Sequence, residues 1–402
     1  YYDAFSSVSD NRATSFGLVD NLRVVEIQTP LFGDDFDSDS SGNWAVHKST
    51  DDTAVTFAYD YSADGIPAAP NSDGSTIGIK FEANIAAPTG AEGVSISPAD
   101  GNFTGDYQVK FDMWINANGP FPGGGSGSTE FFTAGVGTTG DHLQWAFDSA
   151  DGAWFGVTGE GGSSGDFRAH IGGAHQAAES GAYAAGTTGD SRNNTNAHYA
   201  DAFPGQSPPA AQAAAFPDKQ TGALANGAVG FAWRQVTITK IGDSVTWAID
   251  GVAIATLEQS LGAFTTEGNI FVGYYDAFSS VSDNRATSFG LVDNLVVHDL
   301  GADTIRGLWS FDNGDLSASV GSSLEYLDGP DGATAGATEF GTTDSFELPG
   351  IQGESAAVMK VGYVGSNANF GYLMKHGIAP NGGGNRVNQY TLIYDVYFTG
   401  GG

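Results

Sequence analysis

The segment Trp233–Glu258, WRQVTITKIGDSVTWAIDGVAIATLE, decides the fold class. Hydrophobic and polar side chains alternate along it with a period of two, which is typical of β-strands that bury one face. Val245 and Trp247 share the buried face of one such strand. The dipeptide Asp250-Gly251 favours a tight hairpin turn, because both central positions of that turn need a positive φ. The segment therefore predicts consecutive antiparallel strands.

The same alternation recurs along most of the chain. The composition agrees with it, since 59 Gly, 26 Phe, 15 Tyr and 7 Trp are typical of many short strands joined by Gly-rich turns. The stretch 159–227, rich in Gly and Ala, has no such pattern, and we interpret it as a long loop insertion. The other predicted strands are Ala54–Tyr61, Ile77–Glu82, Tyr107–Asn116, Phe131–Val136, Leu143–Phe147, Ala153–Val157, Asn269–Asp276 and Thr287–His298. We predict an all-β protein.

An internal repeat sets the domain organisation. The 22 residues of Tyr1–Leu22, YYDAFSSVSDNRATSFGLVDNL, recur unchanged at Tyr274–Leu295. Each copy is followed by what looks like the start of a new domain, so the repeated block is interpreted as the end of one. We expect residues 1–29 to be the closing strands of a preceding or neighbouring-subunit domain, 30–300 a complete domain, and 303–402 the opening part of a second.

Two stretches resemble a known family. The hairpin pattern W-x-x-V … V-x-W-x-x-D-G in Trp233–Gly251 is similar to that of laminin-G-like, concanavalin-A-like lectin and glucanase domains. The stretch Gly307–Gly329, GLWSFDNGDLSASVGSSLEYLDG, resembles such domains in large bacterial surface proteins. The resemblance implies tandem concanavalin-A-like jelly-roll β-sandwiches in an extracellular or cell-surface protein.

Charge and composition exclude several classes of function. A net charge of −32 repels nucleic acid and anionic lipid, so neither is an expected partner. No run of 18 apolar residues occurs, so we predict no membrane insertion. The absence of Cys excludes thiol catalysis and a disulfide framework.

Acidic residues at the two ends of the complete domain form a candidate calcium site. Carboxylate and carbonyl oxygens are the ligands that calcium prefers, and a jelly roll pairs its first strand with its last. The resemblance implies that such modules often hold structural calcium here. The alternative is that these side chains only cap turns. The candidate ligands are Asp34, Asp35, Asp37, Asp293 and Asn294.

Carbohydrate binding and hydrolysis are the activities that the resemblance implies for this fold. Trp145 and Trp154 are the candidate stacking platform for a sugar ring, the alternative being that both belong to the core. The paired Glu of laminarinase-type members, in the pattern E-x-D-x-x-E, is absent, as are zinc-protease, nucleophile-elbow and P-loop motifs. We therefore predict that the chain is not an enzyme.

The repeat also suggests a joint between copies. The stretch Tyr1–Glu26 of a neighbouring copy would pair with the strand that opens at Gly307–Phe311, and head-to-tail repetition would give a filament. The alternative is that both ends continue covalently in one long chain. The predicted joint residues are Tyr1, Tyr2, Phe5, Phe16, Leu18, Trp309 and Phe311.

The sequence thus favours a structural repeat subunit of an extracellular fibre or adhesin-like array, whose partners are copies of itself. The alternative is a calcium-assisted carbohydrate-binding module with a polysaccharide partner. A glycan hydrolase is a distant third.

Overall fold

The chain divides into two compact units. In the computed structural model, Thr29–Gly301 form one, the large unit, and Tyr1–Gln28 form the other, the small unit, together with Ala302–Gly402. The structure describes residues 16–26, 30–86, 90–127, 129–147, 150–279, 281–300, 304–351, 354–362, 370–378 and 390–398. Residues 16–26 and the described residues of Ala302–Gly402 therefore share one unit, and the domain assignments made from the repeat stay predictions.

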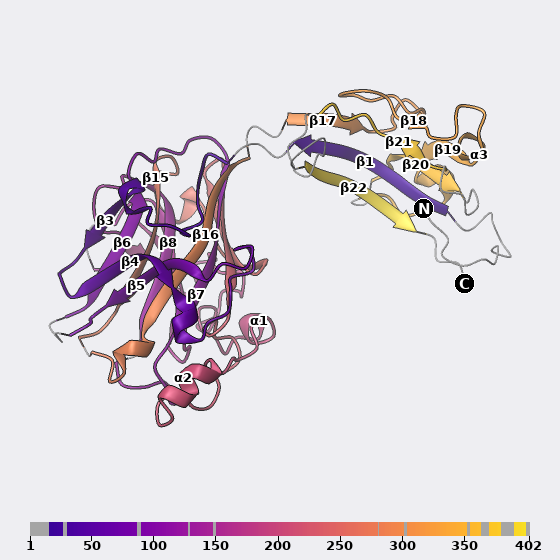
Figure 1. The fold of residues 1–402 in the computed structure, drawn as a ribbon. Coiled ribbons are helices and arrows are strands. Elements are labelled where there is room, and N and C mark those ends of the chain that lie inside the picture. The colour runs from indigo at the N-terminus through magenta and orange to yellow at the C-terminus, as the bar shows by residue number, and fades with distance from the viewer. Residues whose placement is uncertain are drawn as a thin grey trace. The chain divides into compact units, whose positions relative to one another are not determined.

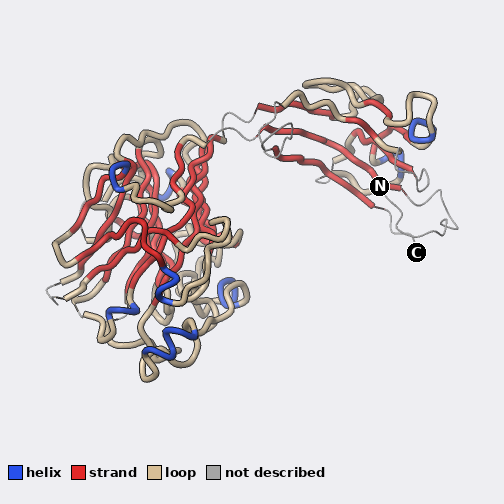
Figure 2. The backbone as a smooth tube through the Cα atoms, viewed as in Figure 1, coloured by secondary structure: helices blue, strands red, loops and turns tan. Residues whose placement is uncertain are grey.

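The large unit is a sandwich of two antiparallel sheets, which Figures 1 and 2 show facing each other. The seven-stranded sheet runs in the order β11 (Ala174–His175), β10 (Phe167–Ile171), β9 (Ala153–Thr158), β8 (Glu130–Thr138), β15 (Asn269–Asp276), β6 (Glu92–Pro98) and β3 (Trp44–Lys48). The eight-stranded sheet runs in the order β14 (Val252–Leu257), β13 (Ser244–Ile249), β12 (Arg234–Ile241), β7 (Tyr107–Asn116), β16 (Phe289–Asp299), β5 (Ile77–Ala83) and β4 (Thr53–Asp60), with β2 (Phe32–Asp34) also on β16. The prediction of an all-β sandwich is confirmed.

The segment that decided the fold class forms the meander β12–β13–β14. Ile238 lies opposite Trp247 across the first pair of strands, and Ile249 lies opposite Val252 across the second. Asp250 and Gly251 have φ values of 51° and 77°, as the predicted turn requires. The core between the sheets contains Val236 and Ile238 of β12 and Val245, Trp247 and Ile249 of β13.

The stretch 159–227 is more ordered than a loop insertion. It contains β10, β11 and two short helices, α1 (Ala197–Ala200) and α2 (Ala210–Ala215). The Tyr199 ring stacks on Phe167 with 3.9 Å between ring centres, and Phe203 is fully buried beside them. The stretch therefore contributes to the core, through aromatic residues spaced too irregularly to predict a strand.

The small unit contains a five-stranded sheet and a separate two-stranded sheet (Figure 1). Its strands are β17 (Thr304–Trp309), β1 (Phe16–Glu26), β20 (Ala357–Gly362), β19 (Thr338–Thr342) and β22 (Tyr390–Phe398), and β18 (Glu325–Tyr326) pairs with β21 (Tyr372–Leu373). A short helix, α3 (Ala333–Gly336), precedes β19. β1 is the central strand, since it pairs with β17, β20 and β22.

Helices of the described residues are all short. None of them is long and apolar enough to span a membrane.

Candidate functional site

The predicted calcium ligands near the first strand are occupied by hydrogen bonds. β2 pairs with β16, so that Asp34 lies opposite Leu295, which is the pairing expected of the first and last strands. One carboxylate oxygen of Asp34 accepts from the backbone N–H of Phe36 at 2.9 Å, and the other accepts from the Trp44 indole N–H at 2.7 Å. Both oxygens of Asp34 are thus engaged within the protein.

The next two acids behave similarly. Asp35 accepts from the backbone N–H of Asp37 at 3.1 Å, and the Ser75 hydroxyl donates to Asp37. These bonds fit the alternative interpretation, in which the acids cap a turn. Among the described residues, no three His, Asp or Glu side chains are grouped so that they could hold a metal ion. A calcium ion at the predicted ligands stays a prediction.

Asp293 lies deeper, on the face of β16 that points away from the core. It is fully buried opposite Asp112 of β7, and the Tyr61 hydroxyl donates to its Oδ2 at 2.8 Å. Its Oδ1 has no hydrogen-bond partner among the described residues. Burial raises the pKa of Asp293 to about 7, and the Asp112 charge adds to that effect.

Asp112 is buried too, but its carboxylate is well supplied with donors. Asn71 donates to it from its backbone N–H at 3.2 Å and from its side-chain amide at 2.9 Å, and the Asn294 amide donates at 3.3 Å. Burial nevertheless raises the pKa of Asp112. The register of β16 against β7 shifts between Asp293 and Val296, and Asn294 in this bulge has a φ of 52°.

The bulge borders a groove of about 420 Å³ on the outer face of the eight-stranded sheet. Lys110 and Gln235 flank core residues on their strands, so they point outward into the groove. Burial lowers the pKa of His298, which keeps that imidazole neutral. The groove is lined by Asp34, Asp35, Asn71, Lys110, Phe111, Gln235, Asn294, Leu295, Val296 and His298. Three of these are amides, each with donors and an acceptor.

A partly exposed indole lies on the same face. Trp233 precedes Gln235 by two residues, so the two side chains share one face. Its ring lies 5.1 Å from Tyr61 and 5.8 Å from Trp114, and its Nε1–H donates to the Pro67 carbonyl at 2.7 Å. Trp233 belongs to the segment from which the fold class was predicted. Its position on the outer face follows from the alternation of side chains, because Val236 points into the core between the sheets.

The predicted sugar platform lies on the other sheet and belongs to the core. Trp154 is fully buried, stacks on His170 at 3.6 Å and donates to the Gly172 carbonyl at 2.7 Å. Trp145 is 8% exposed and packs on Tyr275. Only Phe147 beside them is open to solvent, with 52% of its surface exposed. Trp145 and Trp154 therefore present no ring face to a ligand.

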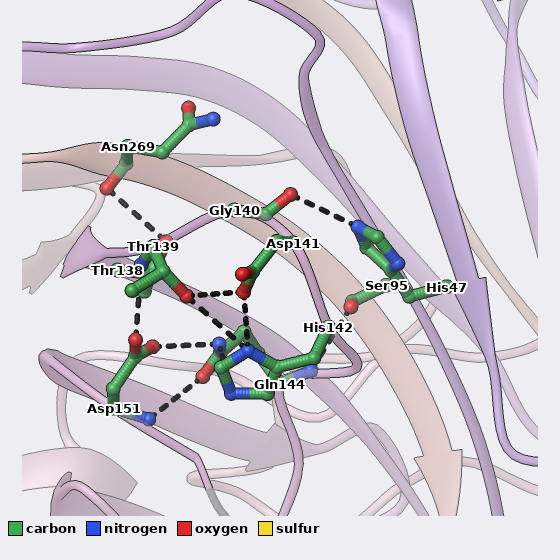
Figure 3. Close-up of polar contacts among 10 residues, drawn as sticks. All are labelled: His47, Ser95, Thr138, Thr139, Gly140, Asp141, His142, Gln144, Asp151 and Asn269. Atoms are coloured by element: carbon green, nitrogen blue, oxygen red, sulfur yellow. Dashed lines mark hydrogen bonds and ion pairs between the residues drawn. The ribbon is translucent and has the colours of Figure 1, made fainter.

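A polar network fixes the loop that carries Trp145 (Figure 3). The Gln144 amide donates to Asp151 at 2.6 Å and to the His142 Nε2 at 3.1 Å, while its carbonyl oxygen accepts from the backbone N–H of Asp151. Because Nε2 of His142 accepts, its Nδ1 carries the proton and donates to Asp141 at 2.7 Å. The network stabilises this loop, because its polar groups are hydrogen-bonded to one another.

A second buried acidic group lies at one end of the sandwich. Glu130 faces Asp276 across β8 and β15, and Glu160 is nearby. Burial raises the pKa of Asp276 to about 6 and that of Glu160 to about 8. No sequence motif indicated these residues, since they come from separate strands.

The predicted joint residues fall in the small unit. Tyr1, Tyr2 and Phe5 lie outside the described residues, and Phe16 begins β1. Leu18 is buried against Val358. Trp309 and Phe311 are buried with Leu22 in the core of the small unit.

No protein-family model and no curated protein matches the chain. The solved structures that are similar to it include a protein of unknown function with a galectin-like fold from Bacillus subtilis (10% identity, 68% of this chain and 98% of that one, TM-score 0.32). They also include the exoplasmic/lumenal domain of VIP36 bound to Ca²⁺ and Man2 (8% identity, 70% and 88%, TM-score 0.35). An endo-β-1,3-glucanase from Pyrococcus furiosus is a third example (10% identity, 69% and 98%, TM-score 0.35). These are lectin-like and glucanase folds. The laminin-G-like part of the expected resemblance stays a prediction.

Proposed function

We propose that the large unit binds a neutral carbohydrate in the groove on the outer face of the eight-stranded sheet. One observation carries this proposal: Asn71, Gln235 and Asn294 converge there, beside the half-buried Asp34 and the exposed Asp35. Sugar hydroxyls both donate and accept hydrogen bonds, and amide side chains can do the same. The partly exposed Trp233 on this face supplies an apolar surface for a sugar ring.

Charge favours an uncharged ligand. The groove carries Asp34 and Asp35 against the single base Lys110, and the chain has a net charge of −32. Such a field disfavours sulfated or uronic-acid polysaccharides. We therefore expect neutral glucans, mannans or xylans to bind more tightly than their anionic counterparts.

The proposed binding does not use a calcium ion. Asp34 and Asp112 already accept hydrogen bonds from protein donors, and an ion would have to displace these. We expect the affinity to be unchanged in the presence of a chelator. A loss of binding on chelation that calcium restores would support calcium-assisted binding in place of this version.

We also propose binding without turnover. Asp34 and Asp35 line the groove from consecutive positions, and both accept hydrogen bonds from the protein. Asp112 and Asp293 are buried and do not line it. A glycosidase needs its two carboxyl groups to reach opposite sides of one sugar ring. Incubation with the bound polysaccharide is expected to release no reducing ends.

Calorimetric titration with neutral oligosaccharides tests the binding proposal. Gln235→Ala removes an exposed amide, and we expect it to weaken binding about tenfold, with Trp233→Ala weakening it by at least as much. Phe147→Ala is the matched control, because it removes an exposed aromatic ring from the other sheet. No measurable binding of any neutral glycan, or equal losses in all three variants, would overturn the proposal.

A structural role is the second proposed function. We propose that the chain is a repeat of an extracellular or cell-surface, adhesin-like array, because the small unit repeats strand pairings of the eight-stranded sheet. Leu18 faces Lys360 across β1 and β20, as Leu291 faces Lys80 across β16 and β5. Electron microscopy of the purified protein tests this role: filaments support it, and dispersed particles at all concentrations contradict it.

A further inference from the structure

The N-terminal strand β1 occupies in the small unit the place that β16 occupies in the large one. β1 pairs with β22 through Asp20 and Asp395, and its register shifts directly after Asp20. β16 pairs with β7 through Asp293 and Asp112, and its register shifts directly after Asp293. Asp20 and Asp293 are the same position of the repeated 22 residues. The repeated strand sequence therefore forms the same strand pairing, with the same bulge, in both units.

The first strand of each unit after its linker, β17 in the small unit and β2 in the large one, also pairs in the same way with the repeated strand. β17 pairs with β1 so that Arg23 faces Leu308, and β2 pairs with β16 so that Val296 faces Gly33. Beyond these strands, Phe311 and Phe36 are both buried with φ values of 56° and 57°. A bulky residue rarely adopts a positive φ, so its presence at both places marks the same turn.

β1 is what holds the small unit together. β17, β20 and β22 each pair with β1, and no pairing among these three is present in the part of the chain that the structure describes. Leu22 on β1 packs with Trp309, Phe311 and Met359 in the small core. Without β1, the described strands of Ala302–Gly402 keep only the pairings β19–β20 and β18–β21, so a strand with the sequence of β1 is needed to complete the five-stranded sheet.

We infer that the small unit takes this central strand from a second copy of the chain as well as from its own N-terminal stretch. The two parts of the small unit are separated in sequence by the whole large unit, Thr29–Gly301. Main-chain hydrogen bonds and side-chain contacts are the same whether the strand arrives from the same chain or from another, so exchange of an identical element costs little. The partner is a second copy of this chain, because the pairings and the core contacts of the small unit require a strand with the sequence of β1.

Concentration decides between the two arrangements. A strand on the same chain competes at an effective concentration that is on the order of millimolar for a short flexible connection. Exchange between chains therefore increases as the protein concentration approaches that value. Exchange in one direction continues from copy to copy, whereas reciprocal exchange closes a dimer.

Engineered cysteines test the exchange, since the chain has none of its own. An affinity-tagged Arg23→Cys chain and an untagged Leu308→Cys chain are mixed in denaturant, refolded together at several concentrations and oxidised. Pairing between copies brings the two cysteines together in a disulfide-linked heterodimer. We expect the heterodimer fraction to increase severalfold from micromolar to near-millimolar protein.

The matched control uses the equivalent positions of the large unit, Val296→Cys and Gly33→Cys in separate chains. The large unit contains both of its strands in one continuous stretch, so this pair is expected to stay at background. A chain with both Arg23→Cys and Leu308→Cys reports whether the pairing forms and tolerates cysteine. Heterodimer at the control level, or no cross-link in the doubly substituted chain, overturns the inference. Filaments seen without interchain cross-links would overturn it while leaving the array role in place.

Discussion

At the scale of single residues, the carboxyl groups divide by burial. Exposed Asp39 has a lowered pKa because the Ser41 side chain and then the Ser41 backbone N–H donate hydrogen bonds to it. Asp293 is fully buried and its pKa is raised to about 7. Buried carboxyl groups of this kind are neutral at mildly acidic pH. At alkaline pH they ionise in a site where no water solvates the charge, which is unfavourable.

Asp293→Asn tests the cost of that ionisation. A raised pKa means that the folded state binds the proton more tightly, so the stability from the protonated Asp293 is complete below about pH 4 and is lost as the pH rises through about 7. Asn is neutral at every pH and keeps an acceptor for Tyr61. We expect the gain of the variant over the wild type to be larger at pH 8 than at pH 5, by on the order of 1 kcal/mol or more.

Urea denaturation at the two pH values measures the difference. The control is Asp39→Asn, which removes an exposed acid with a lowered pKa and should reduce stability at both pH values. An Asp293→Asn variant with the same relative stability at pH 5 and pH 8 would show that Asp293 does not titrate between them.

At the scale of elements, the meander β12–β13–β14 depends on the turn at Asp250-Gly251. Gly251 has a φ of 77°, and a Cβ at that position would meet no other atom within 4 Å. The cost of Gly251→Ala is therefore one of backbone conformation, about 1 kcal/mol. Gly42→Ala is the control, because Gly42 also has open space around it but no positive φ. Thermal denaturation should show the lower melting temperature only for Gly251→Ala.

The elements that the sequence predicted well are those with local causes. The alternation and the turn dipeptide of Trp233–Glu258 depend on neighbours in sequence, and the structure has both. β10 and the aromatic residues of the stretch 159–227 were missed because Phe167 is fixed by Tyr199, far along the chain. The groove was predicted only in part: Asp34, Asp35 and Asn294 were candidate ligands expected to lie close together, and they line it. Asn71 was missed because it comes from a loop, and the bulge at Asn294 has no sequence signal. The expected platform at Trp145 and Trp154 failed because period-two aromatic residues fit either face of a covered sheet.

At the scale of the whole molecule, the two units differ in how their strands are ordered in sequence. The large unit begins and ends within Thr29–Gly301, whereas the small unit needs both Tyr1–Gln28 and Ala302–Gly402. Deletion of Tyr1–Gln28 can therefore unfold the small unit while the large unit stays folded. The large unit keeps every strand of both of its sheets when Tyr1–Gln28 is absent.

Deletion of residues 1–28 tests this organisation by differential scanning calorimetry. We expect the full chain to show a transition that the shortened chain lacks, because β17, β20 and β22 lose their common partner and the core loses Leu22. The transition of the large unit should keep its midpoint within about 2 °C, since none of its strands has changed. Addition of a peptide with the sequence Phe16–Gln28 should restore the missing transition, and a peptide of the same composition in scrambled order is the control. A shortened chain that loses both transitions would show that the large unit depends on the small one, and one that keeps both would show that β1 is dispensable.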